Sequence, residues 1–358
     1  MNAAVILPAL TAALAGVFSA ALLDQWRERR RGYQLIWGIG MLFFAIASAA
    51  EAIAALGGWS EALYRGWYLT GAVWTAGWLG LGTCFLLART RFGYAVALCL
   101  FLAGLFTFLA ARRLPEPAGD APILYFVFAG VLAAAVAVET YFQNERWTAL
   151  AAAAVMGATL ASLSLMLTSA LPAPGYAIDA RTGIPTAEII PPALRLLTPF
   201  MNVTGGLALI LGAIFSAYVF MPKRRVLAYS LDADQPGDSF LFNLFIAPVA
   251  ITVNFAASLP QALAALVRGR LNSRVPATLL IALGALVASS TDTLARFGST
   301  ELFQVGKLVG VVLLFAGFLI SVEVFREIRV PFTGRVLRPP RSEHGKSLGM
   351  DQPAEQHG

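Results

Sequence analysis

Ten long runs of apolar residues, almost free of charge, constrain this sequence more than any other feature. A helix rises about 1.5 Å per residue, so about 20 apolar residues cross the hydrocarbon core of a bilayer. No run alternates apolar with polar residues, so helices fit and a β-barrel does not. Only 13% of the 358 residues are charged, against about a quarter in soluble domains. The sequence predicts an all-α, polytopic integral membrane helix bundle.

The runs form a group of seven followed by a group of three. They cover residues 2–23, 33–59, 64–88, 93–111, 121–138, 147–171, 192–221, 241–267, 275–294 and 302–325. We expect a seven-helix membrane region (1–221), a cytoplasmic loop (222–240), a C-terminal membrane region of two or three helices (241–326), and a tail (327–358) that is basic and then disordered. The Pro-rich loop 172–192 is expected outside.

The number of crossings depends on the run 241–267. If all ten runs cross, with the N-terminus outside, 11 Lys and Arg residues lie inside and 14 outside; if 241–267 returns to the same face, the split is 19 to 6. The excess of basic residues in cytoplasmic loops favours the second arrangement. Pro248, Asn254 and Pro260 would break the helix, as a re-entrant hairpin requires, although 27 uncharged residues also suit an ordinary crossing. We predict nine or ten helices in the cell membrane, with the tail in the cytoplasm.

Charge and rare residues exclude several function classes. The net charge of +6 comes from short Arg-rich clusters between the runs, which suit anionic lipid headgroups and not nucleic acid. Both histidines lie in the tail and both cysteines lie in apolar runs, so neither a His-ligated haem or metal nor a disulfide framework is expected. No cofactor is predicted. No catalytic signature such as HExxH or GxSxG occurs.

Two carboxylates within the apolar runs are the strongest candidates for function. An ionised acid at the centre of a membrane helix costs roughly 2.5–3.5 kcal/mol, so such residues usually face a cavity, pair with a base or titrate. Glu51 and Asp292 lie toward the outer ends of their runs. They are either proton- or cation-coupling acids or ordinary interfacial acids.

Three basic residues accompany these acids. Lys307 is the only lysine in an apolar run; it either extends its ammonium to the outer interface or, less expectedly, forms a Schiff base with a chromophore. Arg65 and Arg195 begin runs on the outer side. If either of them meets Glu51, Glu61 or Asp292, the acid concerned has a structural role.

An aromatic stripe marks the third run. Trp67, Trp74 and Trp78 recur at helical spacing on one face. They either form a wall on which a substrate stacks or serve as interfacial anchors and packing residues.

A faint internal repeat links the two ends of the chain. Residues 46–61 resemble residues 287–301, with Glu51 opposite Asp292, although abundant Ala, Leu, Gly and Ser produce such matches by chance. Duplicated halves are common in transporters, with the site at the repeat interface.

The sequence favours a secondary transporter or permease-like protein for a small molecule, in which the buried acids couple or gate transport. A membrane sensor or scaffold subunit that acts through a partner is the alternative, and a lipid-handling enzyme is a weaker one. The sequence does not determine the oligomeric state.

Overall fold

The computed structural model describes residues 3–112, 114, 119–171, 189–227, 246–272, 274–296, 300–321, 328–329, 331–333 and 336–338. The helices are α1 (Ala3–Arg29), α2 (Gly32–Gly57), α3 (Glu61–Trp67), the π-helix η1 (Tyr68–Trp74), α4 (Thr75–Leu86), α5 (Phe92–Ala111), α6 (Ala121–Tyr141), α7 (Arg146–Thr168), α8 (Pro192–Phe220), α9 (Ala247–Val267), α10 (Arg274–Arg296) and α11 (Thr300–Ile320). The strands β1 (Ile328–Arg329) and β2 (Val336–Arg338) form an antiparallel pair.

The described chain confirms the all-helical prediction. Because α3, η1 and α4 follow one another without a break, they form one segment, and ten segments are long and apolar enough to cross a membrane. Local signals start several helices. The Ser60 hydroxyl accepts a hydrogen bond from the Leu63 N–H at the start of α3, and α6, α8 and α9 each have proline in the first turn.

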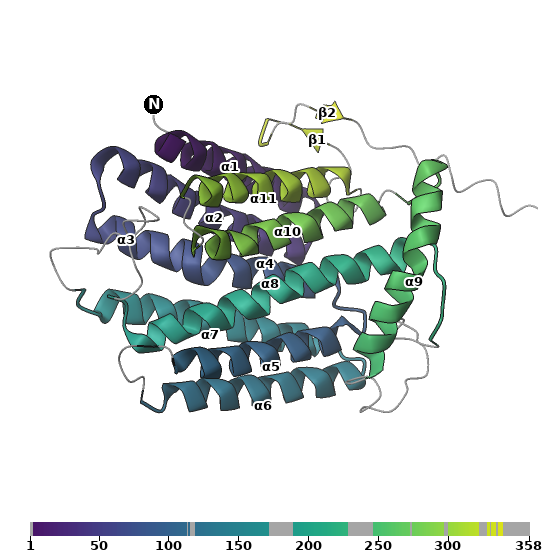
Figure 1. The fold of residues 1–358 in the computed structure, drawn as a ribbon, viewed down its shortest axis with the longest axis horizontal. Coiled ribbons are helices and arrows are strands. Elements are labelled where there is room, and N and C mark those ends of the chain that lie inside the picture. Colours follow the sequence, from purple (N-terminus) through teal and green to yellow (C-terminus); the bar gives the residue numbers. More distant parts are fainter. Residues whose placement is uncertain are drawn as a thin grey trace, which may run out of the picture.

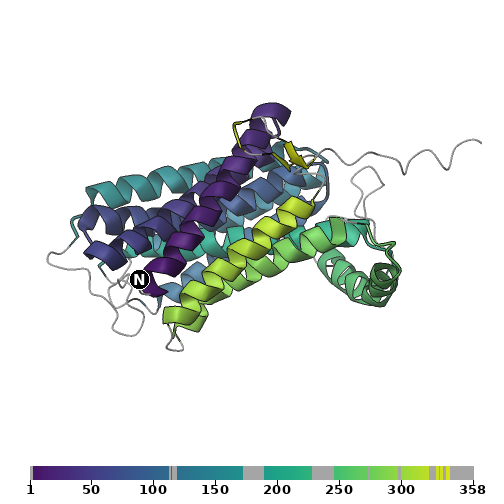
Figure 2. The same cartoon turned by 90° about the horizontal axis from the view of Figure 1, so that it is seen from above.

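Among the described segments, nine run lengthwise through the bundle, and α9 lies across one end of it (Figure 1). We call this end the α9 end. Neighbours in the chain pair as antiparallel hairpins, most closely α1 with α2, α5 with α6, and α10 with α11. Helix α8 packs against α4, α5 and α10 and so joins the N-terminal hairpins to the last one (Figure 2).

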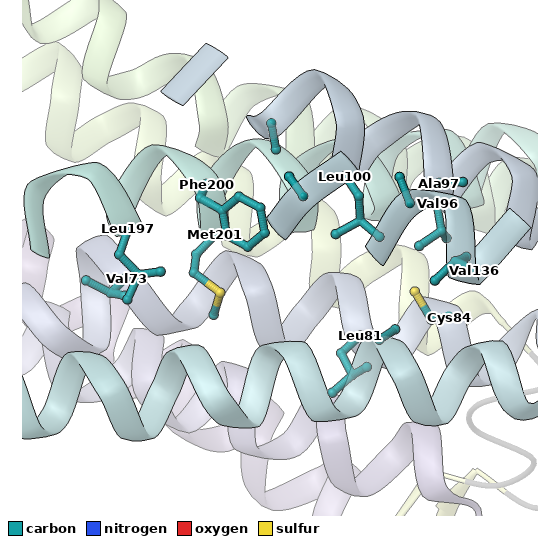
Figure 3. Packing of buried hydrophobic residues seen from close by; sticks show 14 of the residues in the cluster. Val73, Leu81, Cys84, Val96, Ala97, Leu100, Val136, Leu197, Phe200 and Met201 are labelled. Atoms are coloured by element: carbon teal, nitrogen blue, oxygen red, sulfur yellow. The ribbon is translucent and has the colours of Figure 1, made fainter. Parts of the chain in front are cut away.

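The largest hydrophobic core lies between η1 and helices α3 to α8, and includes Leu81, Cys84, Leu100 and Met201 (Figure 3). Here α4 and α8 meet backbone to backbone at Gly80 and Gly205. A Cβ on Gly205 would overlap the backbone of Ala76, so the contact requires glycine.

A second core joins α1, α2 and α11. Phe318 on α11 contacts the rings of Phe18 and Trp37, with centroid separations of 5.0 and 4.7 Å. The Trp37 Nε1 donates to the Leu79 carbonyl at 2.9 Å, which ties α2 to α4.

Helix α9 is not broken at the residues that suggested a re-entrant hairpin. It is one continuous helix from Ala247 to Val267, with Pro248 in its first turn and Pro260 inside it. The first turn of a helix needs no N–H donor, so Pro248 is tolerated there. Pro260 lies inside the helix and does not end it. Asn254 does not break α9 either; its side chain bonds the chain segment at residues 226–227.

The tail begins with a short hairpin that was not expected from the sequence. The Phe332 N–H donates to the Asp24 Oδ1 at 3.1 Å, and the Arg27 guanidinium lies 5.6 Å from the Phe332 ring centroid. The tail therefore contacts α1 at the α9 end. Residues 172–188, most of the loop 222–240, and residues 339–358 lie outside the described residues, so the predictions made for them stay predictions.

Candidate functional site

Glu51 accepts hydrogen bonds from three side chains of two distant parts of the sequence. Both carboxylate oxygens contact the Lys307 Nζ, at 2.8 and 2.7 Å, and Oε2 also accepts from the Gln304 Nε2 at 2.9 Å. The Trp67 Nε1 donates to Oε1 at 2.8 Å. Glu51 lies on α2, Trp67 ends α3, and Gln304 and Lys307 lie one turn apart on α11.

The ion pair is shielded from solvent. The side chains of Glu51 and Lys307 are only 5% and 9% exposed. The Lys307 ammonium also lies 5.7 Å from the ring centroid of Phe44 and 5.1 Å from that of Phe303. Aromatic faces attract a cation, so these rings replace part of the hydration that the ammonium loses on burial.

The pair lies below one end of the bundle and not at its rim. Glu51 is six residues from the end of α2, and Lys307 is seven residues from the start of α11. At about 1.5 Å per residue, both positions are about 9–10 Å from their helix ends. The two charges therefore meet at the same depth, at the end opposite α9.

Long side chains, and not close backbones, make this connection. Helix α11 packs mainly on α10 and α1, and α2 packs mainly on α1 and α4, whereas the backbones of α2 and α11 make few contacts with each other. The Glu51–Lys307 pair is thus a polar bridge between the hairpin α10–α11 and the N-terminal helices.

Two polar atoms in or near the bridge have no hydrogen-bond partner among the described residues. They are the Gln304 Oε1 and the Ser48 Oγ, which lies one turn before Glu51 on α2. Both atoms are buried. A buried acceptor or hydroxyl without a partner is costly, so these atoms could receive a water or a polar ligand group.

The prediction that Lys307 extends to the interface is wrong. Its ammonium is drawn inward because Glu51 offers two charged acceptors, which outweighs the access to water that the end of α11 would give. The two residues lie 256 positions apart in the chain, and no local pattern in the sequence indicates that they meet.

Arg65 has a structural position. Its guanidinium bonds Glu61 one turn earlier, at 2.5 and 2.8 Å, and the carbonyls of Met166 and Ser169 at the end of α7. It therefore satisfies the last carbonyl groups of a helix, as basic residues often do there. Arg65 meets Glu61, one of the three acids considered for it, and no contact with Glu51 is found in the described part of the chain.

The indole N–H groups of the three tryptophans point to different parts of the bundle. Trp67 donates to Glu51, whereas Trp74 and Trp78 donate to Ser162 and Thr159 on α7. The π-helix between Trp67 and Trp74 has a wider turn than an α-helix, so the α-helical spacing that predicted a single stripe does not hold there. Trp67 belongs to the ion-pair site, and the other two connect α4 to α7.

Asp292 lies near the end of α10, but its side chain is outside the described residues, so its predicted role stays a prediction. The suggested repeat is compatible with one feature of the site. One residue out of the register that places Glu51 opposite Asp292, Glu61 matches Glu301, and the same separation relates Trp67 to Lys307, which both donate to Glu51.

Gln304 and Ser48 were missed by the sequence reasoning, which searched for charges. Their positions carry a usable signal, because Gln304 lies three residues before Lys307 and Ser48 three before Glu51, on the same helix faces.

A separate cavity of about 30 Å³ lies between α4, α5, α7 and α8. It is lined almost entirely by apolar residues, among them Leu81, Leu100 and Met201, and does not include the ion pair. Within the described residues, no group of three or more His, Cys, Asp or Glu side chains is placed to hold a metal ion.

No family model matches this chain, and neither a curated protein nor a solved structure was found to be similar to it.

Proposed function

We propose that this chain is an integral membrane transporter in which the Glu51–Lys307 pair gates movement of the α10–α11 hairpin. The observation that carries the proposal is the buried ion pair, which bridges two helices whose backbones hardly meet. The proposal has three parts: the membrane, the orientation and the gate.

Outward-facing apolar surfaces support the proposed insertion into a membrane. On α6, large residues such as Leu124, Phe128 and Val131 are more than half exposed, and Leu160 and Leu167 on α7 are similarly exposed. A continuous apolar surface of this kind is unfavourable in water and favourable in lipid.

The distribution of basic residues supports the orientation. Up to residue 321, the described residues place thirteen Lys and Arg residues at the α9 end and four at the opposite end, and Lys307 is buried in the ion pair near that opposite end. The thirteen are Arg27, Arg29, Arg30, Arg31, Arg89, Arg91, Arg146, Lys223, Arg224, Arg225, Arg268, Arg270 and Arg274; the four are Arg65, Arg112, Arg195 and Arg296. Because cytoplasmic loops carry the basic excess, the α9 end is cytoplasmic. Nine segments then cross, the N-terminus is outside, and the ion pair lies near the outer side.

The energetics of burial support the gate. A buried ion pair is seldom more stabilising than apolar residues of the same volume, because both charges lose their hydration. Breaking the pair leaves one buried charge without a partner, which is costly. We therefore expect the pair to break only when the helices move or when another charged group replaces one member. A proton on Glu51, or a substrate cation in place of Lys307, would free α11 from α2. Ser48 and Gln304 offer nearby polar atoms to a substrate.

A distance measurement tests the gate without knowledge of the substrate. Spin labels on Leu56→Cys and Leu302→Cys, both exposed at the outer end, report the separation of α2 and α11 by pulsed electron resonance. We expect a longer or broader distribution in Glu51→Gln than in the unsubstituted chain in lipid, because the amide cannot hold the ammonium as an ion pair.

Glu61→Gln is the matched control, since Glu61 is a carboxylate at the same end but lies half exposed. It should behave as the unsubstituted chain. Identical distributions in all three proteins would contradict the gate.

Native mass spectrometry of the same proteins tests transport of a small molecule. We expect a copurifying molecule that is lost in Glu51→Gln and retained in Glu61→Gln. Loss in neither variant would remove the substrate from this site. Visible absorbance would instead support the chromophore at Lys307.

A further inference from the structure

The exposed face of helix α9 is apolar, whereas the exposed face of a helix in water is usually polar. Its inward face contains Ala250, Asn254, Ser258 and Ala262, which recur every fourth residue and are all buried. Its outward face contains large apolar side chains. Val253, Leu259, Leu263, Leu266 and Val267 are 38–87% exposed. An ordinary surface helix has the opposite arrangement.

The polar groups of the inward face are satisfied by the preceding segment of this chain. Asn254 Oδ1 accepts from the N–H groups of Val226 and Leu227 at 2.8 Å, and its Nδ2 donates to the Leu227 carbonyl at 2.8 Å. The Ser258 Oγ accepts from the Arg224 N–H at 2.9 Å. These bonds fix the rotation of α9 about its axis, so its apolar face is held outward.

Helix α9 also lies across the bundle end and not along the bundle (Figure 2). Its outward face therefore lies beyond the ends of the lengthwise helices and not alongside their middle parts. A helix with one apolar face that lies in the plane of a bilayer buries that face at the boundary between headgroups and acyl chains.

Basic residues lie beside the middle of α9, where Arg224 bonds Ser258, and directly after its C-terminal end. Residues 222–227 and 246–274 contain Lys223, Arg224, Arg225, Arg268, Arg270 and Arg274 and no acidic residue. Burial lowers the pKa of Lys223, and the positive charge of the neighbouring Arg225 lowers it further. Arg274 lies 4.4 Å from the Phe220 ring centroid. An anion at this surface would relieve the repulsion between these side chains.

We propose that α9 is an interfacial helix that binds anionic phospholipids of the cytoplasmic leaflet. The leucine and valine face lies among the upper acyl chains, and the basic residues beside the middle of α9 and after its C-terminal end bind lipid phosphates. Arg268 and Arg270 are the principal ligands, because both are exposed and follow directly on the last turn of α9. This inference rests on the proposed membrane insertion but not on the proposed gate.

Depth-dependent quenching tests the position of α9. A fluorophore on Leu263→Cys is measured in vesicles whose lipids carry nitroxides either near the headgroup or deep in the acyl chain. We expect stronger quenching by the shallow nitroxide. Val131→Cys, at the middle of α6, is the control for a crossing helix and should be quenched more by the deep nitroxide.

The Val131→Cys control distinguishes a failure of membrane insertion from a wrong position of α9. If Val131 is not quenched, membrane insertion itself is wrong. If Val131 behaves as expected and Leu263 is quenched mainly by the deep nitroxide, α9 crosses the bilayer. If Leu263 is instead quenched only by aqueous iodide, its face is in water or covered by a protein partner. Either of the last two results overturns the inference.

Lipid retention tests the basic residues. The protein is purified from phosphatidylcholine vesicles containing one-third phosphatidylglycerol, and bound lipid is counted by native mass spectrometry. We expect Arg268→Gln with Arg270→Gln to retain at least about threefold less phosphatidylglycerol. Arg112→Gln, an exposed arginine at the opposite end, should retain it normally. Equal retention in both variants, or equal retention of phosphatidylcholine by the unsubstituted chain, overturns the proposed ligands.

Discussion

The roles of Glu51 and Lys307 can be interpreted only from the contacts that they make in the folded chain. Each alone is an isolated charge in an apolar run. Together with Gln304 and Trp67 they form a buried network in which the carboxylate is satisfied by three donors. Removal of one member should therefore cost more than removal of the pair.

Lys307→Met should lower the free energy of unfolding by about 3–5 kcal/mol, because it leaves the Glu51 carboxylate buried without its cation. The double variant Glu51→Gln with Lys307→Met should recover most of this loss, since no unpaired charge remains. Thermal unfolding in detergent, followed by circular dichroism, measures both. A double variant as unstable as the single one would show that the pair is not the source of the effect.

The sequence was sufficient to identify Glu51 and Lys307 as unusual, because a charge within an apolar run is costly. It could not pair them, because their proximity depends on the packing of α1, α2 and α11. It also could not place Trp67 apart from Trp74 and Trp78, since nothing in the local composition indicated the π-helix.

At the scale of elements, contacts through glycine determine which helices approach most closely. Gly80 and Gly205 bring α4 and α8 into backbone contact, and Gly284, Gly310 and Gly317 do the same for α10 and α11. The Asn202 side chain donates to the Ala72 carbonyl in η1 at 2.9 Å, which ties α8 to the wide turn just above the first contact.

Gly205→Ala should destabilise the protein by about 1–3 kcal/mol, because its Cβ would overlap the backbone of α4. Gly206→Ala is the matched control: its Cβ would meet only the Ser289 Oγ, at 3.6 Å, which is an ordinary contact. Melting temperatures of the two variants in the same detergent make the comparison. Equal melting temperatures would count against the backbone contact between α4 and α8.

The boundaries of the apolar runs predicted the helices well, because a crossing helix must be both long and apolar. The orientation of α9 was not predictable in this way. Its composition resembles that of a crossing helix, with a mean hydropathy of 1.5, and only its contacts with residues 224–227 reveal which face is inward.

At the scale of the molecule, the arrangement of nine lengthwise segments and one transverse helix determines at which end of the bundle each described loop lies. If the α9 end is cytoplasmic, Ala62 at the start of α3 is outside and Glu145 before α7 is inside.

A membrane-impermeant maleimide should therefore label Ala62→Cys in intact cells and Glu145→Cys only after the cells are opened. Cys84 and Cys99 are buried and should give little background. Labelling of Glu145→Cys in intact cells, with protection of Ala62→Cys, would reverse the orientation.

The attachment of α11 differs between its two halves. The half nearer the α9 end is held by the rings of Phe18 and Trp37 against Phe318, and the tail that follows it touches Asp24. The opposite half is joined to α2 by the charges on Glu51 and Lys307. If the ion pair opens as proposed, α11 would pivot at the aromatic contact, and the tip of the α10–α11 hairpin far from α9 would move furthest. The opening would then form at that end of the bundle, while the α9 end stays closed.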